Sequence, residues 1–516
     1  MKKALGIVLV LACLHSFPLA AAYVEIQIPV RDGRSLAADL YAALPIVRKP
    51  TILIQTPYNK NLLRNVSLPF ELDKYYIVIV DWRGFYGSAG AAVPGYDIGL
   101  DGYDCVEWIA AQSWSDGKVG TYGGSALGAV QYMTARRHPP HLVCANPTIS
   151  DLKKDYANFY DGGVYRKERM EAHPEFWDIP TILSHPSRDG YWVNYEAAGD
   201  YAAEINIPMF LATGWFDHFP AQILSDFRDL QTRSNIQVRA KHKLIVGPWS
   251  HTTMNQARQG EMSYPEAVGL LEAMTAAFFG RFLRGETNAY ESYPALQFFQ
   301  MGDNQWLNTT DWQGYGRRQG SLFLRSFGML GRSPELNMAP AGIFQYNPAN
   351  TVPSLDDTPV NFAALVENRS DVLAYTTPAL SQPLKIQGGV VAVLCVFSDR
   401  LDTDFAVWLC DVLPDGRSIR MAQGIQRLRY RSSLSQPELA TPGQMCSITV
   451  DLGELALTIP AGHRVRLDIS SSCYPRNEKN LNDGGPMYPP VGSGLIATNS
   501  VYHSPIHLSR IIWEFH

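Results

Sequence analysis

The chain has 516 residues, of which 46% are hydrophobic and 18% are charged, and its formal net charge at pH 7 is -5. A chain of this length is expected to form two or three domains, and its composition is that of a globular protein. Because the sequence has no long run of basic or acidic residues, we do not expect a nucleic acid as its partner.

The beginning of the chain, residues 1–22, has the pattern of a secretory signal peptide. Two lysines precede an apolar stretch at residues 4–14, and three alanines end at Ala22. The apolar stretch is shorter than the roughly 20 residues that span a membrane, and no later segment is apolar for long enough to do so. We expect a secreted or periplasmic mature chain that starts near Tyr23. A lipoprotein anchored through Cys13 is the alternative, although it would leave apolar residues beyond the lipid site.

Three regions with different patterns follow the signal segment. Strand-like and helix-like runs alternate over residues 23–150 and 204–289, which predicts an α/β domain with a parallel sheet. Residues 151–203 break this alternation and are rich in aromatic and charged side chains, so we expect a helical cap over the sheet. Residues 290–516 contain short strand-like runs with glycine and proline turns, which predict a β-sandwich or jelly roll. We expect this last domain to buttress the first.

Two helices of the α/β domain have clear boundary signals. Residues 101–112 place apolar side chains on one face, with Asp101 as the expected N-cap. Residues 265–283 begin with Pro265, a residue type that suits the first turn of a helix. The sequence therefore predicts an α-helix over each of the two segments.

The cysteines do not form a recognisable metal-binding pattern. Seven are present, and the six beyond the signal segment have neither CxxC spacing nor a Cys/His arrangement. We therefore expect no metal and no other cofactor. Export would permit disulfides, but their pairing cannot be assigned from the sequence, and buried free thiols are the alternative. The six are Cys105, Cys144, Cys395, Cys410, Cys446 and Cys473.

Four predicted strands each end in a polar residue that could take part in catalysis. In chain order these residues are Tyr58, Ser125, Asp217 and His251. Catalytic side chains of open α/β sheets lie outside the carboxyl ends of the strands. A serine, an acid and a histidine in this order form the catalytic triad of α/β-hydrolases. The pattern therefore predicts a serine hydrolase.

The residues around Ser125 support its assignment as a nucleophile. Gly123 and Gly124 permit a tight turn, and the residues that follow can begin a helix whose free N–H groups would lie beside the hydroxyl. The strict Gly-x-Ser-x-Gly pattern fails, because Leu127 stands at its last position and the next glycine is Gly128. The strand, turn and helix around the serine are nevertheless those that the motif requires.

Five motifs of the chain resemble the signatures of the cocaine-esterase-like hydrolases. This family is related to the X-Pro dipeptidyl-peptidases and the α-amino-acid ester hydrolases. The resemblance extends over essentially the whole mature chain and implies an α/β-hydrolase domain, a helical cap and a C-terminal jelly roll. The motifs are TPYNK at residues 56–60, DWRG at 81–84, GGSALG at 123–128, GWFD at 214–217 and GPWSH at 247–251.

The resemblance also implies a role for each site residue. Ser125 would be the nucleophile, His251 its base and Asp217 the group that orients the base. The phenol of Tyr58 and the backbone N–H of Ala126 would form the oxyanion hole. Family members usually have a tyrosine where this chain has Ala126, which keeps the backbone donor and changes the shape of the pocket.

The predicted reaction is the hydrolysis of a small ester or amide through an acyl-enzyme. An alternative is dipeptidyl-peptidase or aminopeptidase activity, which needs an anchor for the substrate ammonium such as Asp155, Glu168 or Glu171. An alternative of another class is a carbohydrate-binding jelly roll beside a degenerate hydrolase domain, which the intact Ser, Asp and His disfavour. We interpret Asp81 and Arg83 as a structural ion pair or as loop anchors. The substrate and a possible homo-oligomer are left open.

Overall fold

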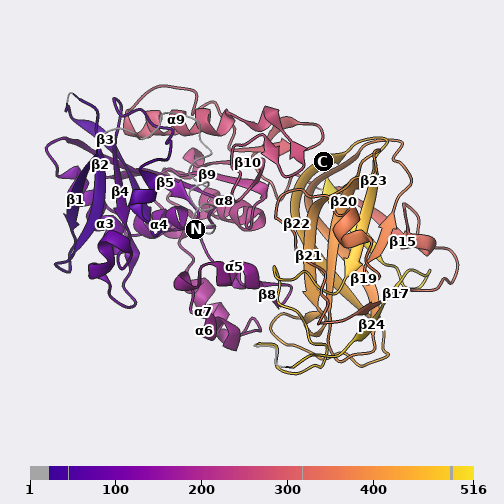
Figure 1. Ribbon diagram of the computed structural model, residues 1–516. Coiled ribbons are helices and arrows are strands. Elements are labelled where there is room, and N and C mark those ends of the chain that lie inside the picture. Colours follow the sequence, from indigo (N-terminus) through magenta and orange to yellow (C-terminus); the bar gives the residue numbers. More distant parts are fainter. Residues whose placement is uncertain (1–22, 45, 317, 489–491) are drawn as a thin grey trace.

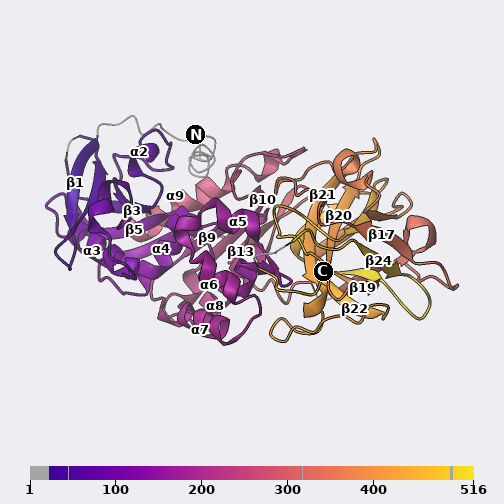
Figure 2. The same ribbon diagram turned by 60° about the horizontal axis from the view of Figure 1, so that its bottom comes forward.

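The computed structural model describes residues 23–516 apart from 45, 317 and 489–491. The predictions of a signal peptide and of the Cys13 alternative concern residues 1–22 and lie outside the described residues. The chain forms an α/β body from its first part and a β body from its last part, which lie side by side (Figure 1 and Figure 2). In the described part of the chain, no helix is both long and apolar enough to cross a lipid bilayer.

A ten-stranded sheet is the centre of the α/β body. Its neighbouring strands from β4 to β13 pair in parallel, and antiparallel pairs lie at both edges. Every residue of β3, β4, β9 and β10 is buried, as expected of parallel strands covered on both faces. In sheet order the strands are β1 (Tyr23–Pro29), β2 (Ser35–Tyr41), β4 (Tyr76–Asp81), β3 (Lys49–Thr56), β5 (Ser115–Gly124), β6 (Leu142–Thr148), β9 (Phe210–Phe216), β10 (Lys243–Ser250), β13 (Leu296–Gln300) and β14 (Gln305–Thr309).

Helices cover both faces of this sheet. The helices α3 (Ile98–Ala110), α4 (Ala126–Ala135) and α8 (Pro220–Arg233) contribute to one hydrophobic cluster. The helices α2 (Lys60–Leu63) and α9 (Leu270–Leu283) contribute to a second cluster. The α3, α4 and α8 helices lie on the opposite side of the strands from α9 (Figure 1). This three-layer arrangement is the α/β architecture that the alternation of elements predicts.

The helix predicted over residues 101–112 begins earlier than expected. Asp97 is its N-cap, because the Asp97 carboxylate accepts a hydrogen bond of 2.8 Å from the backbone N–H of Gly99. Asp101, the cap that we expected, lies instead in the first turn of the helix and is buried. The prediction of the cap was therefore wrong, since an acidic residue suits the first turn as well as the cap.

The helix predicted over residues 265–283 is interrupted near its beginning. Pro265–Ala267 form a single 3₁₀ turn, η6, and the α-helix starts only at Leu270. Gly269 lies between them with a φ of 94°. Glycine adopts this left-handed conformation without steric cost, and the conformation ends the first turn before the helix begins.

The predicted boundary at residue 290 does not coincide with the point at which the chain passes from one sheet to the other. The two strands that follow it, β13 and β14, extend the sheet of the α/β body instead of joining the β body. The cause is the parallel pairing of β13 with β10, in which Leu244 lies beside Leu296 and Val246 beside Phe298. The sheet of the β body begins with β15 (Arg318–Arg325).

The insertion after β6 forms a small cap with an aromatic core. Tyr156, Phe159, Tyr160, Tyr165 and Trp192 pack together in it and are almost fully buried. Most of its aromatic side chains thus hold the cap together, which explains why this segment is rich in them. Its elements are η2 (Tyr156–Asn158), β7 (Tyr160–Asp161), β8 (Val164–Tyr165), α5 (Lys167–Ala172), η3 (Pro174–Phe176), α6 (Ile179–Ser184), α7 (Gly190–Ala198) and η4 (Ala202–Glu204).

The β body is an eleven-stranded sheet in which almost all neighbouring strands are antiparallel. Its longest strand, β19, pairs with β22 along one edge and with β24 and β25 along the other. The six described cysteines are free thiols. Besides β15, its strands are β16 (Met329–Gly331), β17 (Gly342–Tyr346), β18 (Leu373–Thr376), β19 (Leu384–Ser398), β20 (Asp404–Val412), β21 (Ser418–Arg427), β22 (Cys446–Ile459), β23 (Arg464–Ser470), β24 (Ala497–Tyr502) and β25 (Arg510–Phe515). A separate hairpin joins β11 (Arg258–Gln259) and β12 (Met262–Ser263).

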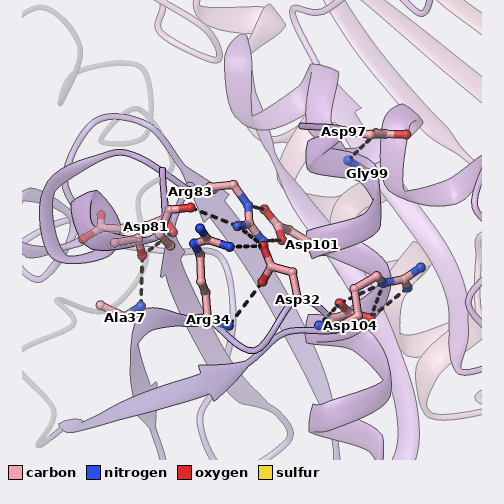
Figure 3. Close-up of polar contacts among 12 residues, drawn as sticks. Asp32, Arg34, Ala37, Asp81, Arg83, Asp97, Gly99, Asp101 and Asp104 are labelled. Atoms are coloured by element: carbon pink, nitrogen blue, oxygen red, sulfur yellow. Dashed lines mark hydrogen bonds and ion pairs between the residues drawn. The ribbon is translucent and has the colours of Figure 1, made fainter. Parts of the chain in front are cut away.

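Asp81 and Arg83, at the end of β4, anchor two different loops (Figure 3). The Asp81 carboxylate accepts a hydrogen bond of 2.7 Å from the backbone N–H of Lys60. The Arg83 guanidinium binds Asp101 at 2.6 Å and Asp32 at 2.7 Å. Their interpretation as loop anchors is therefore confirmed. The alternative that the two residues form an ion pair with each other is wrong, since each binds other groups.

Because Arg83 pairs with a buried carboxylate, we expect Arg83→Met to destabilise the fold more than Lys74→Met, which removes an exposed ion pair. Arg83→Met leaves the buried Asp101 carboxylate without its cation, and we expect the free energy of unfolding to fall by about 3 kcal/mol. Lys74→Met removes an ion pair with Glu71 whose side chains are both at least 40% exposed, and should change little. Urea unfolding followed by circular dichroism tests this, and equal midpoints for the two variants would contradict it.

Candidate active site

The turn between β5 and α4 holds Ser125 in an unusual backbone conformation. Its φ is 58° and its ψ is -123°, a strained combination for a residue with a Cβ atom. Tight packing around the turn depends on two glycines. A Cβ atom on Gly123 would lie 2.6 Å from Cβ of Leu127, and one on Gly128 would lie 2.6 Å from Cβ of Ser150. The close approach of α4 to Ser150 thus requires a glycine at position 128, one position later than the second glycine of the usual motif.

Ser125, His251 and Asp217 form one hydrogen-bonded chain. His251 Nε2 lies 3.0 Å from Ser125 Oγ, and His251 Nδ1 lies 2.7 Å from Asp217 Oδ1. Asp217 also accepts hydrogen bonds from the backbone N–H of His218 (2.6 Å) and the hydroxyl of Thr213 (2.8 Å). Burial acts to raise the pKa of Asp217, but the nearby His251, its hydrogen bond and His218 lower it below its ordinary value. The buried carboxylate therefore stays ionised.

The two residues predicted for the oxyanion hole lie beside Ser125. The phenol of Tyr58 is hydrogen-bonded with the Ser125 side chain and the backbone of Ala126. Burial raises the pKa of Tyr58 to about 12, although both hydrogen bonds act to lower it. The phenol thus keeps its proton at neutral pH and can donate a hydrogen bond to an anionic oxygen. All five predicted site residues come together.

A cavity of about 650 Å³ lies over these residues and is large enough for a small organic substrate. Its floor is the end of the sheet, and its wall is formed by the cap and by loops of the β body. Aromatic rings make up much of the wall. They belong to Tyr58, Trp82, Phe176, Trp177, Tyr195 and Phe219.

Of the three acidic residues predicted as ammonium anchors, only Glu168 lines the cavity. Asp155 instead caps η2 by accepting a hydrogen bond of 3.3 Å from the backbone N–H of Asn158. Glu171 forms an ion pair of 2.8 Å with Lys167. Of these three residues, only Glu168 is therefore placed to bind a substrate ammonium.

The β body contributes two charged residues that the sequence analysis missed. Asp357 and Arg476 line the cavity and form an ion pair with each other. An Asp357 oxygen also lies 3.4 Å from Nδ1 of His218, whose ring is 4.7 Å from the ring of His251. The expectation that this domain only buttresses the first is therefore incomplete. His218 follows Asp217 directly, so its position near the site could have been inferred from the sequence. Nothing in the sequence indicates that Asp357 and Arg476 lie near His218.

One group of acidic and thiol side chains among the described residues is compact enough to hold a metal ion. It consists of Glu367, Cys410 and Asp468 in the β body, outside the cavity. Burial and the neighbouring Glu367 raise the pKa of Asp468 well above its ordinary value, and Glu367 forms an ion pair with Arg466. A protonated Asp468 and this ion pair account for the group. The expected absence of a metal and a cofactor stays a prediction.

Comparison with known proteins identifies relatives along nearly the whole chain. Residues 32–173 and 165–253 match the X-Pro dipeptidyl-peptidases (S15 family), and residues 288–512 match the X-Pro dipeptidyl-peptidase C-terminal non-catalytic domain. The cocaine esterase of Rhodococcus sp. (strain MB1 Bresler) is 30% identical, over 95% of this chain and 97% of the esterase.

Two solved structures have the same fold. An aminopeptidase from a marine sediment archaeon (Thaumarchaeota archaeon) matches with a TM-score of 0.83 and 20% identity, over 98% of each chain. An α-amino acid ester hydrolase matches with a TM-score of 0.82 and 22% identity, over 97% of this chain and 98% of that one. At these identities the likeness concerns the fold alone.

Fold and site together define an α/β-hydrolase with a C-terminal domain that is mostly β-sheet. The chain belongs to the cocaine-esterase-like family and is a serine hydrolase. The predictions of the fold class, the family and the class of enzyme are confirmed.

Proposed function

We propose that the protein hydrolyses a small ester or amide through an acyl-enzyme on Ser125. The observation that carries this proposal is the hydrogen-bonded chain from Ser125 through His251 to Asp217 at the floor of an aromatic cavity. A serine hydroxyl is a weak nucleophile on its own, and an adjacent base within hydrogen-bond distance is what activates it. The family relationship supports the same chemistry.

The proposed reaction has two similar halves. Ser125 Oγ attacks the carbonyl carbon of the substrate while His251 Nε2 takes its proton, and Asp217 stabilises the resulting imidazolium. The Tyr58 hydroxyl and the Ala126 N–H stabilise the oxyanion, after which His251 gives the proton to the leaving group. Water then attacks the acyl-enzyme with His251 as the base, and the acid product leaves.

Two alternatives are weaker. Cleavage at peptide N-termini would require an anchor for an ammonium group, and Glu168 lines the cavity; however, the positively charged Arg169 lines it as well and disfavours a cationic substrate. A carbohydrate-binding protein with a degenerate hydrolase domain is disfavoured, since its first domain would have no reason to keep a buried, ionised Asp217 bound to His251.

Removal of the nucleophile or the base tests the mechanism. We expect Ser125→Ala and His251→Ala each to lower kcat more than 100-fold, because the two side chains act as one unit. A fluorophosphonate probe should label the wild-type protein and not Ser125→Ala. Ser184→Ala, which changes an exposed serine of the cap, is the matched control and should keep both labelling and turnover. More than about one per cent residual kcat in Ser125→Ala would refute the proposed role.

Tyr58→Phe tests the oxyanion hole, because it removes one hydroxyl group and almost no volume. We expect kcat for a p-nitrophenyl ester to fall about 100-fold with little change in KM, the result for a contact made mainly in the transition state. Tyr191→Phe, a change in the cap at a ring stacked on His185, should leave kcat unchanged. An unaltered kcat in Tyr58→Phe would leave Ala126 as the remaining predicted donor.

We further propose that the enzyme is exported and that residues 1–22 are removed, on the evidence of the sequence pattern alone. When the full-length chain is expressed in a Gram-negative host, N-terminal sequencing of the periplasmic protein should give a start near Tyr23. Ala22→Arg should leave the precursor uncleaved, because a small residue is needed there. If the protein is instead recovered from membranes, and Cys13→Ala abolishes this membrane association, the result would support the lipoprotein alternative.

A further inference from the structure

The lysine and arginine side chains that line the active-site cavity form ion pairs, with one exception. Lys154 binds Asp151 at 2.8 Å, Arg166 lies 3.5 Å from Asp161, and Arg476 pairs with Asp357. Arg169, on helix α5 of the cap, also lines the cavity. Among the described residues it has no ion-pair partner, and its Nη1 atom is buried without a hydrogen-bond acceptor.

The surroundings of Arg169 make this lack of a partner costly. Its guanidinium lies over the ring of Phe219, 3.9 Å from the ring centre, so an aromatic face replaces a carboxylate as its neighbour. Burial and, to a lesser extent, the nearby positive Arg166 lower the pKa of Arg169 to about 9, although the carboxylates of Asp151, Asp217 and Asp161 act to raise it. An anion that enters the cavity would remove this penalty, since a buried charge is stable only when it is paired.

Arg169 is also close enough to the reacting groups to hold a substrate over them. Phe219, which it covers, has its ring 6.2 Å from the ring of His251. The charge of Arg169 also acts to lower the pKa of Tyr58, which lies beside Ser125, and the pKa of His218, whose ring is 4.7 Å from the ring of His251. A group bound to the guanidinium would therefore lie in the same cavity as the carbonyl that Ser125 attacks.

From this arrangement, and resting on the proposed function, we propose that Arg169 binds a carboxylate of the substrate. The enzyme then prefers esters or amides that carry a free carboxylate in addition to the bond that is cleaved. A guanidinium presents parallel N–H donors that match the two oxygens of a carboxylate, and the aromatic wall accommodates the apolar chain between the two ends of the substrate. The carboxylate can belong to the acyl part or to the leaving group.

Two matched pairs of esters test the proposal and distinguish the two positions. Mono-(4-nitrophenyl) glutarate and 4-nitrophenyl pentanoate differ by a carboxylate in the acyl part. The acetate ester 4-acetoxybenzoate carries a free carboxylate in its leaving group, and its methyl ester does not. We expect the wild-type enzyme to have the higher kcat/KM for the anionic member of at least one pair. Arg169→Met should lower that value about 10- to 100-fold while it changes the neutral member less than about twofold.

Control variants separate this proposal from folding and from the proposed function. Arg188→Met, which removes an exposed arginine of the cap that binds Glu196, should alter neither pair. Arg169→Lys keeps the charge and should recover part of the preference; Arg169→Gln serves if Arg169→Met fails to fold. An equal loss on both members of a pair, or no preference in the wild type, overturns the role of Arg169. Hydrolysis that survives Ser125→Ala overturns the proposed function instead.

Discussion

The parallel pairing of β9 with β10 is the constraint on which the active site depends. The two strands stay in register up to a bulge in β10. In this bulge the backbone of Trp249 lies against Gly214, where a Cβ atom would be only 2.0 Å from the Trp249 carbonyl oxygen. No side chain fits in that space, so glycine is required for the two strand ends to stay adjacent. Their proximity brings Asp217 and His251, 34 residues apart, to within 2.7 Å.

A second constraint is the strained turn at Ser125. A residue with a Cβ atom adopts a φ of 58° at a cost, and the close packing of α4 on the sheet has to hold it there. The turn places the hydroxyl beside both His251 and Tyr58. The cap and the β body then close the space above, and they bring in charges from segments far along the chain. Most of these charges neutralise one another, and the unpaired Arg169 is the basis of the preference for a substrate carboxylate that we propose.

Much of the site could be predicted because its residues follow directly on buried strands. An apolar run that ends in a polar residue is a local pattern, and Ser125, Asp217 and His251 each have one. Element boundaries were harder to predict. Asp97 and Asp101 are chemically equivalent as caps, and they are distinguished only by the hydrogen bond that the backbone N–H of Gly99 donates to the Asp97 carboxylate. The strands β13 and β14 have no local feature that assigns them to one sheet or the other.

The sequence by itself determined the class of fold, the order of the candidate catalytic residues and the family, because these depend on local patterns and short motifs. Only the tertiary structure decided which charges meet in the cavity. Asp357 and Arg476 come from the β body, more than a hundred residues from His251, and Arg169 comes from the cap. Whether a charged side chain finds a partner depends on distances between segments that are remote in sequence. The substrate preference that we infer from Arg169 therefore requires the folded chain.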